Sequence, residues 1–115
     1  MMTNNMMTNN IMTNNYNFQE VLCDISKLLL FKLKISHNKP SDFKIGDRVV
    51  VLHSIDFFDT TPIGSIGIIE NIMHRYKHTP NEHYEYWVYV GNHKTRYEID
   101  NIVNMDRAFN IMNKI

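Results

Sequence analysis

Apolar and polar positions alternate through residues 43–104 and predict a small β-sheet. β-Branched and aromatic residues at a period of two are typical of strands that bury one face. Four strands are predicted, at Arg48–His53, Ile66–Met73, Tyr84–Val90 and Arg96–Val103. Because a small sheet exposes its edges unless it closes, we expect a five-stranded, partly open barrel over residues 43–104, with one short strand or turn not assigned.

A helical stripe precedes the sheet, and residues 16–35 are predicted to form one amphipathic helix. Asn17 is expected to cap its first turn, and Glu20 is placed to complete a capping box. The predicted stripe consists of Val21, Leu22, Ile25, Leu28 and Leu29, broadened by Leu30, Phe31 and Leu33. So broad a stripe must pack on the barrel or dock to another chain, and packing within the chain is the more common outcome.

Three shorter segments complete the predicted organisation. Residues 1–15 are three tandem five-residue units rich in Met, Thr and Asn, which predict a disordered, low-complexity leader. Residues 36–42 are a linker, because Pro40 disfavours helix just before it. Asn104 is expected to cap a C-terminal helix over residues 105–115, whose apolar face should seal one mouth of the barrel. The predicted fold class is therefore mainly β with flanking helices.

The composition of the chain excludes several classes of function but does not identify one. Lysine plus arginine balance aspartate plus glutamate at 12 each in 115 residues, so the whole chain has no field that attracts nucleic acid or anionic membrane. Cys23 is the single cysteine, which excludes an intrachain disulfide and a four-cysteine zinc site. No apolar run approaches the roughly 18 residues needed to cross a bilayer. A soluble, intracellular protein with no membrane partner is expected.

Two glycine-containing runs carry a resemblance to a known fold family. They are Gly46-Asp-Arg-Val-Val-Val and, further along, Gly64-Ser-Ile-Gly-Ile-Ile. Together with the aromatic strand that follows, they resemble the SH3-like barrels of the KOW and Tudor kind over residues 43–103. The resemblance implies a small SH3-like barrel. It does not imply one function, because such barrels bind RNA, DNA, ribosomes, methylated tails or other proteins.

Four aromatic side chains are the predicted protein-binding residues: Phe57, Phe58, Trp87 and Tyr89. Adjacent aromatics in an extended loop cannot both point inward, so either Phe57 or Phe58 should be exposed or cap the barrel. Trp87 and Tyr89 should share the outer face of their strand, where such residues are typical interface anchors. An alternative, the one favoured for these two residues, places Trp87 and Tyr89 beneath the long helix. A third possibility is a Tudor-like aromatic cage for a methylated cation.

Four basic residues are the alternative, nucleic-acid-binding set: Arg75, Lys77, Lys94 and Arg96. They flank the aromatic strand and could contact phosphates, although the first loop is acidic and aromatic where KOW-type nucleic-acid binders usually carry basic loops. His74, His78 and His83 lie in the same region, but their spacing matches no standard zinc site. A solvated loop is the expected structure, with no metal and no cofactor.

No catalytic arrangement is visible in the sequence. Nucleophilic or acid–base chemistry needs a positioned group with an oriented partner, and Cys23 is expected on a buried helical face. We therefore expect a non-enzymatic adaptor acting through protein–protein contacts, with self-association through the N-terminal helix as one option. The frequent Asn suggests a virus, a phage or an AT-rich microbe as the source, and a virus- or phage-encoded component of a larger assembly is expected. The alternatives are a KOW-type nucleic-acid or ribonucleoprotein module and an accessory subunit of an enzyme.

Overall fold

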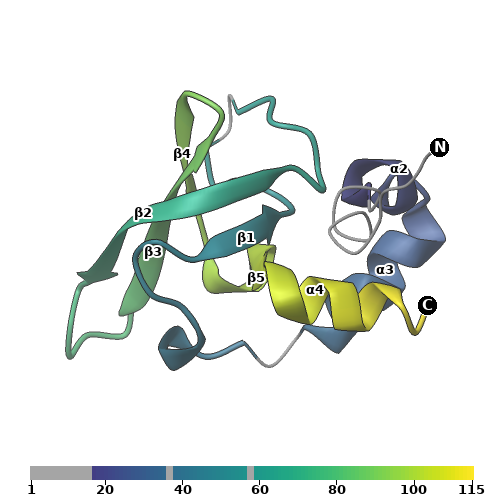
Figure 1. Cartoon of the computed structure of the whole chain (residues 1–115). Helices are drawn as coiled ribbons and strands as arrows, with labels where there is room; N and C mark the ends of the chain where they lie inside the picture. Colours follow the sequence, from purple (N-terminus) through teal and green to yellow (C-terminus); the bar gives the residue numbers. More distant parts are fainter. Residues whose placement is uncertain (1–16, 36–37, 57–58) are drawn as a thin grey trace, which may run out of the picture.

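A five-stranded antiparallel sheet with flanking helices forms the body of the molecule (Figure 1). The structure is a computed structural model that describes residues 17–35, 38–56 and 59–115. The sheet has the order β4-β3-β2-β1-β5. Its strands are β1 (Arg48–Val51), β2 (Ile66–Arg75), β3 (His83–Val90), β4 (His93–Tyr97) and β5 (Ile102–Asn104). The predicted leader and the Phe57-Phe58 pair lie outside the described residues.

The fifth strand comes from the segment that was predicted as one continuous last strand. A 3-10 turn, η2 (Ile99–Asn101), divides that segment into β4 and β5. β4 pairs with β3, whereas β5 crosses to the other edge of the sheet and pairs with β1, placing Val50 opposite Val103. The turn thus allows neighbouring stretches of chain to occupy the two opposite edges.

The sheet does not close into a barrel, because its edge strands are covered by loop groups instead of by each other. On β4, the carbonyl of Arg96 accepts hydrogen bonds from the backbone N–H of Ile55 at 3.2 Å and from the hydroxyl of Ser54 at 2.9 Å. Near β5, the side-chain amide of Asn38 donates to the carbonyls of Ile99 and Ile102. These contacts satisfy edge groups that barrel closure would otherwise pair.

Where one N-terminal helix was predicted, the chain forms two, α2 (Phe18–Leu22) and α3 (Ile25–Lys34). Asn17 caps α2 as expected, since its side chain accepts from the backbone N–H of Glu20 at 3.1 Å. Asp24 then has extended backbone angles and accepts from the N–H of Ser26 at 3.0 Å, which begins a new helix. The apolar stripe continues across this break, so periodicity alone did not reveal it.

The C-terminal helix, α4 (Met105–Met112), packs against the other helices and does not seal a barrel mouth. Phe109 contacts Phe18 of α2 with ring centroids 5.2 Å apart. Asn104 precedes α4 but makes no capping hydrogen bond; its side-chain amide donates to the carbonyl of Asp42. The predicted cap is therefore wrong, and Asn104 ties the short 3-10 turn η1 (Pro40–Asp42) to the end of β5.

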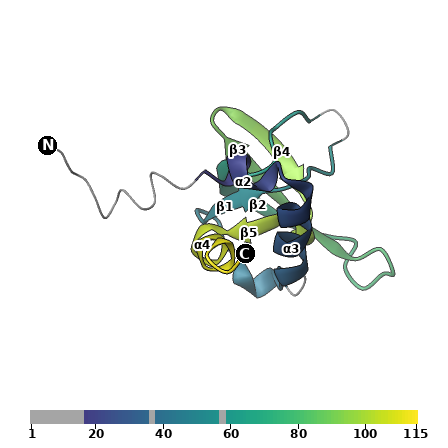
Figure 2. The ribbon, with the colours of Figure 1, turned by 90° about the vertical axis from the view of Figure 1, so that its right-hand side faces the viewer.

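Two hydrophobic cores lie on opposite faces of β1. Val49 and Val51 belong to the core enclosed by the curved sheet, whereas Val50 and Leu52 face the helices. The core within the sheet comprises Phe43, Val49, Val51, Ile69, Tyr86, Val88, Tyr97 and Ile102. The helical core joins α2, α3 and α4 to β1 and β5, which places the helices together at one end of the molecule (Figures 1 and 2).

Gly64 provides a test of how α2 docks on the sheet. Its φ of +94° is unfavourable for other residues, and an added Cβ would lie 2.6 Å from the backbone nitrogen of Gln19 in α2. We expect Gly64→Ala to lower the free energy of unfolding by about 2–4 kcal/mol, measured by urea denaturation.

Gly91 supplies the matched control, since it has a φ of +64° and nothing within 4 Å of an added Cβ. Gly91→Ala should cost only about 1–2 kcal/mol, for the backbone conformation alone. Equal losses in the two variants would contradict the close contact between Gly64 and α2.

Candidate functional site

The outer face of β2, β3 and β4 gathers most of the residues that the sequence singled out. Alternate residues of β3 point away from the core, as predicted: Tyr86 and Val88 are fully buried, whereas Tyr89 is 40% exposed. Across the ladder, Trp87 lies opposite Arg96 and Tyr89 lies opposite Lys94. We name this surface the outer face and define it by Ile66, Ile68, Glu70, Arg75, Glu85, Trp87, Tyr89, Lys94 and Arg96.

A β-bulge in β2 changes which of its residues point to the outer face. The register shifts between Ile69 and Asn71, so that Ile68 pairs with Tyr89 and Asn71 pairs with Trp87. The extra residue changes which side of the strand each later position faces. As a result, Ile68 before the bulge and Arg75 after it lie on the same side of the sheet.

One end of the outer face is apolar and uncovered by any described element. Ile66 and Ile68 are 40% and 47% exposed, and the neighbouring Ile45 is 62% exposed. Ile45, Ile68 and Tyr89 line a shallow hollow of about 620 Å³ together with Gly91 and Asn92. Contiguous apolar surface rimmed by polar groups is typical of interaction sites.

Cations lie over the aromatic rings at the centre of the face. The ammonium of Lys94 is 5.6 Å from the ring centroid of Trp87 and 5.5 Å from that of Tyr89. The guanidinium of Arg96 is 5.6 Å from the Trp87 ring. These separations fall within the range of cation–π attraction. Trp87 and Tyr89 thus pack against basic side chains, and the alternative that placed them beneath the helix is wrong.

Glu85 organises the charged end of the face. It is only 7% exposed, and its carboxylate lies 3.1 Å from Nε of Arg75, 3.1 Å from Nε2 of His83 and 3.8 Å from a guanidinium nitrogen of Arg96. Burial alone would raise the pKa of Glu85, but the hydrogen bonds from His83 and Arg75 and the charges of Arg75 and Arg96 outweigh it and hold the pKa below its ordinary value. Glu85 is therefore ionised and fixes two arginines on the sheet.

The predicted phosphate-binding set is only partly brought together. Arg75, Lys94 and Arg96 share the outer face, whereas Lys77 is exposed in the turn between β2 and β3. Arg75 and Arg96 are paired with Glu85, and Lys94 lies 3.3 Å from a carboxylate oxygen of Glu70. Much of the positive charge that a phosphate would contact is therefore already neutralised within the chain.

The histidines of the β2–β3 hairpin make separate contacts. His74 lies 2.5 Å from the carboxylate of Glu82 and stacks on Tyr84 with centroids 4.3 Å apart, while His83 contacts Glu85. In residues 17–35, 38–56 and 59–115, no group of three or more His, Cys, Asp or Glu side chains is arranged to hold a metal ion. Cys23 is exposed, contrary to the expectation of a buried face, and its thiol donates to the carbonyl of Glu20.

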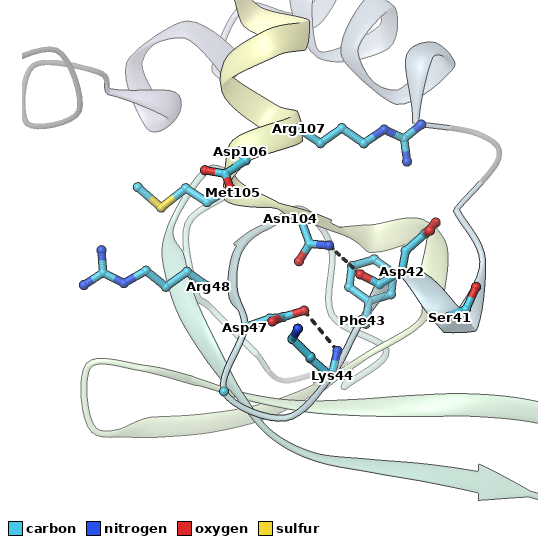
Figure 3. A pocket seen from close by; sticks show the side chains of 11 residues that line it. Ser41, Asp42, Phe43, Lys44, Asp47, Arg48, Asn104, Met105, Asp106 and Arg107 are labelled. Carbon is cyan, nitrogen blue, oxygen red and sulfur yellow. Dashed lines mark hydrogen bonds between the residues drawn. The ribbon is translucent and has the colours of Figure 1, made fainter.

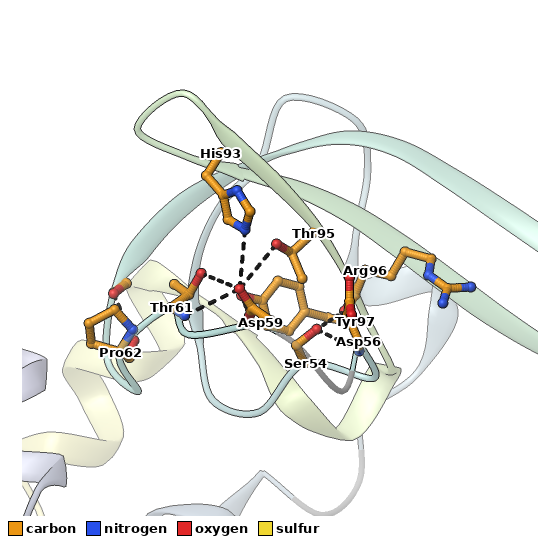
Figure 4. Close-up of polar contacts among 10 residues, drawn as sticks. Ser54, Asp56, Asp59, Thr61, Pro62, His93, Thr95, Arg96 and Tyr97 are labelled. Carbon is orange, nitrogen blue, oxygen red and sulfur yellow. Dashed lines mark hydrogen bonds and ion pairs between the residues drawn. The ribbon is translucent and has the colours of Figure 1, made fainter.

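Asp59 anchors the loop between β1 and β2, a role that sequence reasoning missed (Figure 4). Its side chain is 3% exposed, and it accepts hydrogen bonds from the N–H and hydroxyl of Thr61, from Thr95 and from Tyr97, with His93 at 3.2 Å. The Asp-x-Thr spacing was the available signal, because Asp side chains commonly bond the backbone two residues on. The contacts from β4 depend on the tertiary fold.

The protonation states in this cluster follow from its burial and its hydrogen bonds. Burial alone would raise the pKa of Asp59, but the hydrogen bonds from Thr61, His93 and Thr95 outweigh it and lower the pKa. Burial, together with the nearby Asp59 charge, raises the pKa of Tyr97 to about 12. The loop is thus held to β4 by an ionised carboxylate and a neutral phenol.

A second hollow, of about 620 Å³, lies where η1 and the segment before β1 meet α4 (Figure 3). Several of its polar side chains make contacts within the chain. Asp47 accepts from the backbone N–H of Lys44, and Arg107 donates to the Asn38 side chain and to the carbonyl of Lys34. These bonds join the linker to the sheet and the helices, and we assign the hollow a structural role.

Asp59 gives a pH-dependent prediction. Because its pKa is lower in the folded state than in the unfolded chain, its stabilising effect is present above the ordinary aspartate pKa of about 3.9 and is lost as the pH falls through the lowered value. We expect Asp59→Asn to reduce the free energy of unfolding at pH 7 by about 1–3 kcal/mol. Chemical denaturation from pH 7 to pH 3 should show a weaker pH dependence for the variant than for the natural chain.

Asp100, an exposed residue of η2 outside this cluster, is the control. Asp100→Asn should change stability by less than about 0.5 kcal/mol. An unchanged pH profile in Asp59→Asn would show that the Asp59 carboxylate does not stabilise the loop.

Two observations bear on the class of protein. No helix among the described residues is long and apolar enough to span a bilayer. No family model, curated protein or solved structure matches this chain.

Proposed function

We propose that the chain is a non-enzymatic binding module that contacts a protein partner through its outer face. The observation that carries this proposal is the uncovered apolar end formed by Ile45, Ile66, Ile68 and Tyr89 beside Trp87. A partner that covers these side chains gains about 25 cal/mol for each Å² of apolar surface removed from water. Tyr and Trp are also enriched among the residues that dominate binding energy.

The charged end supports the same proposal by holding the face in one arrangement. Arg75 and Arg96 are fixed by Glu85, and Lys94 is held between Glu70 and the aromatic rings. Side chains that are already ordered lose less conformational entropy when a partner binds. The face combines exposed apolar side chains at one end with ordered charged side chains at the other, and protein–protein interfaces likewise contain both apolar and polar surface.

We also propose that the sheet is an open relative of the SH3-like barrels. Support comes from the position of the two glycine runs, since Gly46 and Gly64 lie two residues before the first residues of β1 and β2, with β5 returning beside β1. Folds of this kind serve many different functions, so the fold assignment does not identify what the chain binds. An accessory subunit of an enzyme would use the same surface and differ only in what it binds.

A nucleic-acid module is the second candidate, and one observation favours it. Arg75, Lys94 and Arg96 share the outer face with Trp87 and Tyr89, and basic side chains beside stacked aromatics are typical of surfaces that bind single strands. Against it, the carboxylates of Glu70 and Glu85 already pair with these cations. Protein binding therefore remains the first proposal.

Variant-dependent capture tests the protein-binding proposal. Full-length tagged chain would be incubated with lysate of the cells that express it, and partners would be quantified by mass spectrometry. We expect Ile68→Glu and Tyr89→Glu to reduce capture of the specific partner at least tenfold, because each places a charge in the apolar contact.

Leu29→Glu on α3 is the matched control, since Leu29 is an exposed aliphatic residue away from the outer face. It should leave capture unchanged, and circular dichroism should show the same fold in all variants. Partners retained equally by the natural chain and by Ile68→Glu would contradict a role for the outer face.

Salt dependence separates the two candidate functions. With its cations paired internally, the chain should show no binding to labelled single-stranded RNA or DNA at about 50 mM salt. Phosphate contacts by three cations would instead give an affinity that falls with salt at a log–log slope of about −2 to −3. Such a slope, reduced in Lys94→Ala, would favour the nucleic-acid module over the protein-binding proposal.

A further inference from the structure

The side of α3 that faces away from the core is apolar. Ile25, Leu29 and Leu33 recur every four residues and are 66%, 60% and 71% exposed, and the adjacent Leu30 is 47% exposed. Leu28 and Phe31 on the other side are buried in the helical core. A helix that is apolar on both sides is ordinarily buried on both.

The apolar surface continues past the start of α3. Leu22, Ile25 and Leu28 line a hollow of about 380 Å³ with Pro62 and Ile63 of the loop before β2. In Figure 2, α3 lies at the surface beside α4, with no described element in front of it. We name Ile25, Leu29, Leu30 and Leu33 the α3 seam.

Charges at the two ends of α3 indicate which occupant fits. The N-terminal end carries Asp24, with Glu20 in the preceding helix, whereas the last turn carries Lys32 and Lys34. Parallel alignment with a second α3 would bring like charges and like helix-dipole ends together. Antiparallel alignment places the acidic end of each helix beside the basic end of the other, which is favourable for both side chains and dipoles.

We propose that the α3 seam is a self-association surface on which a second copy of the chain docks, with the two α3 helices antiparallel about a two-fold axis. Leu29 of each copy lies near the axis, so Ile25 of one copy packs against Leu33 of the other. Residues spaced by four form ridges that interdigitate between helices. Asp24 of one copy then lies near Lys34 of the other.

The size of the seam sets the expected strength. Ten residues of helix extend only about 15 Å, so the interface is smaller than the roughly 800 Å² per partner of standard interfaces. A weak dimer with a Kd of about 10–100 μM follows, and the chain is monomeric at the sub-micromolar concentrations used for capture. The two proposals can therefore be tested separately: the chain could bind a partner through the outer face without forming a dimer, or form a dimer without binding a partner there.

Sedimentation velocity of the full chain over about 1–300 μM tests the association. We expect a concentration-dependent shift from monomer to dimer, and a loss of at least tenfold in affinity in Leu29→Glu. Ile45→Glu, an exposed aliphatic position near the outer face, is the control and should dimerise like the natural chain. A monomer at every concentration, or equal dimerisation of Leu29→Glu, would overturn the proposal.

Cysteine pairing tests the antiparallel orientation. In a Cys23→Ser background, Ile25→Cys and Leu33→Cys chains would be oxidised separately and as a mixture. Antiparallel docking predicts disulfide-linked dimers mainly in the mixture, because Cα atoms must approach within about 7 Å. Cross-linking within each variant alone, or equal amounts in all samples, would overturn the orientation.

Discussion

Burial of β1 on both of its faces is the constraint on which the rest of the structure depends. Val49 and Val51 enter the core of the curved sheet, and Val50 and Leu52 enter the helical core. A strand of this kind cannot shift its register by one residue without exchanging two sets of packed side chains. The helices and the sheet are therefore positioned relative to each other by four consecutive apolar residues.

The outer face shows how a chain with no net charge can hold several charged side chains in place by pairing them locally. Glu85 draws Arg75 and Arg96 together, and Glu70 holds Lys94 near the aromatic rings. The cations thus shape the surface around Trp87 and contribute little net field. The equal numbers of acidic and basic residues in the sequence agree with this local pairing.

Local patterns predicted the strands and the two faces of β3, because alternation of side chains is a property of the strand itself. The buried Tyr86 and Val88 and the exposed Tyr89 could be assigned in this way. The open edges of the sheet could not be predicted, and the expected barrel was wrong, because groups such as Asn38 cover these edges from about sixty residues away in the sequence. The helix break at Asp24 was missed because the apolar spacing continues across it. The Asp59 cluster was missed because the β4 residues that donate to Asp59 are distant from it in the sequence.

Trp87 is the single tryptophan of the chain, and Lys94 and Arg96 both lie over its ring on the outer face. Its indole emission consequently originates from one place on the molecular surface. A molecule that binds there and displaces those cations changes the environment of the Trp87 indole. The intrinsic fluorescence of Trp87 therefore reports binding at the outer face without an added label.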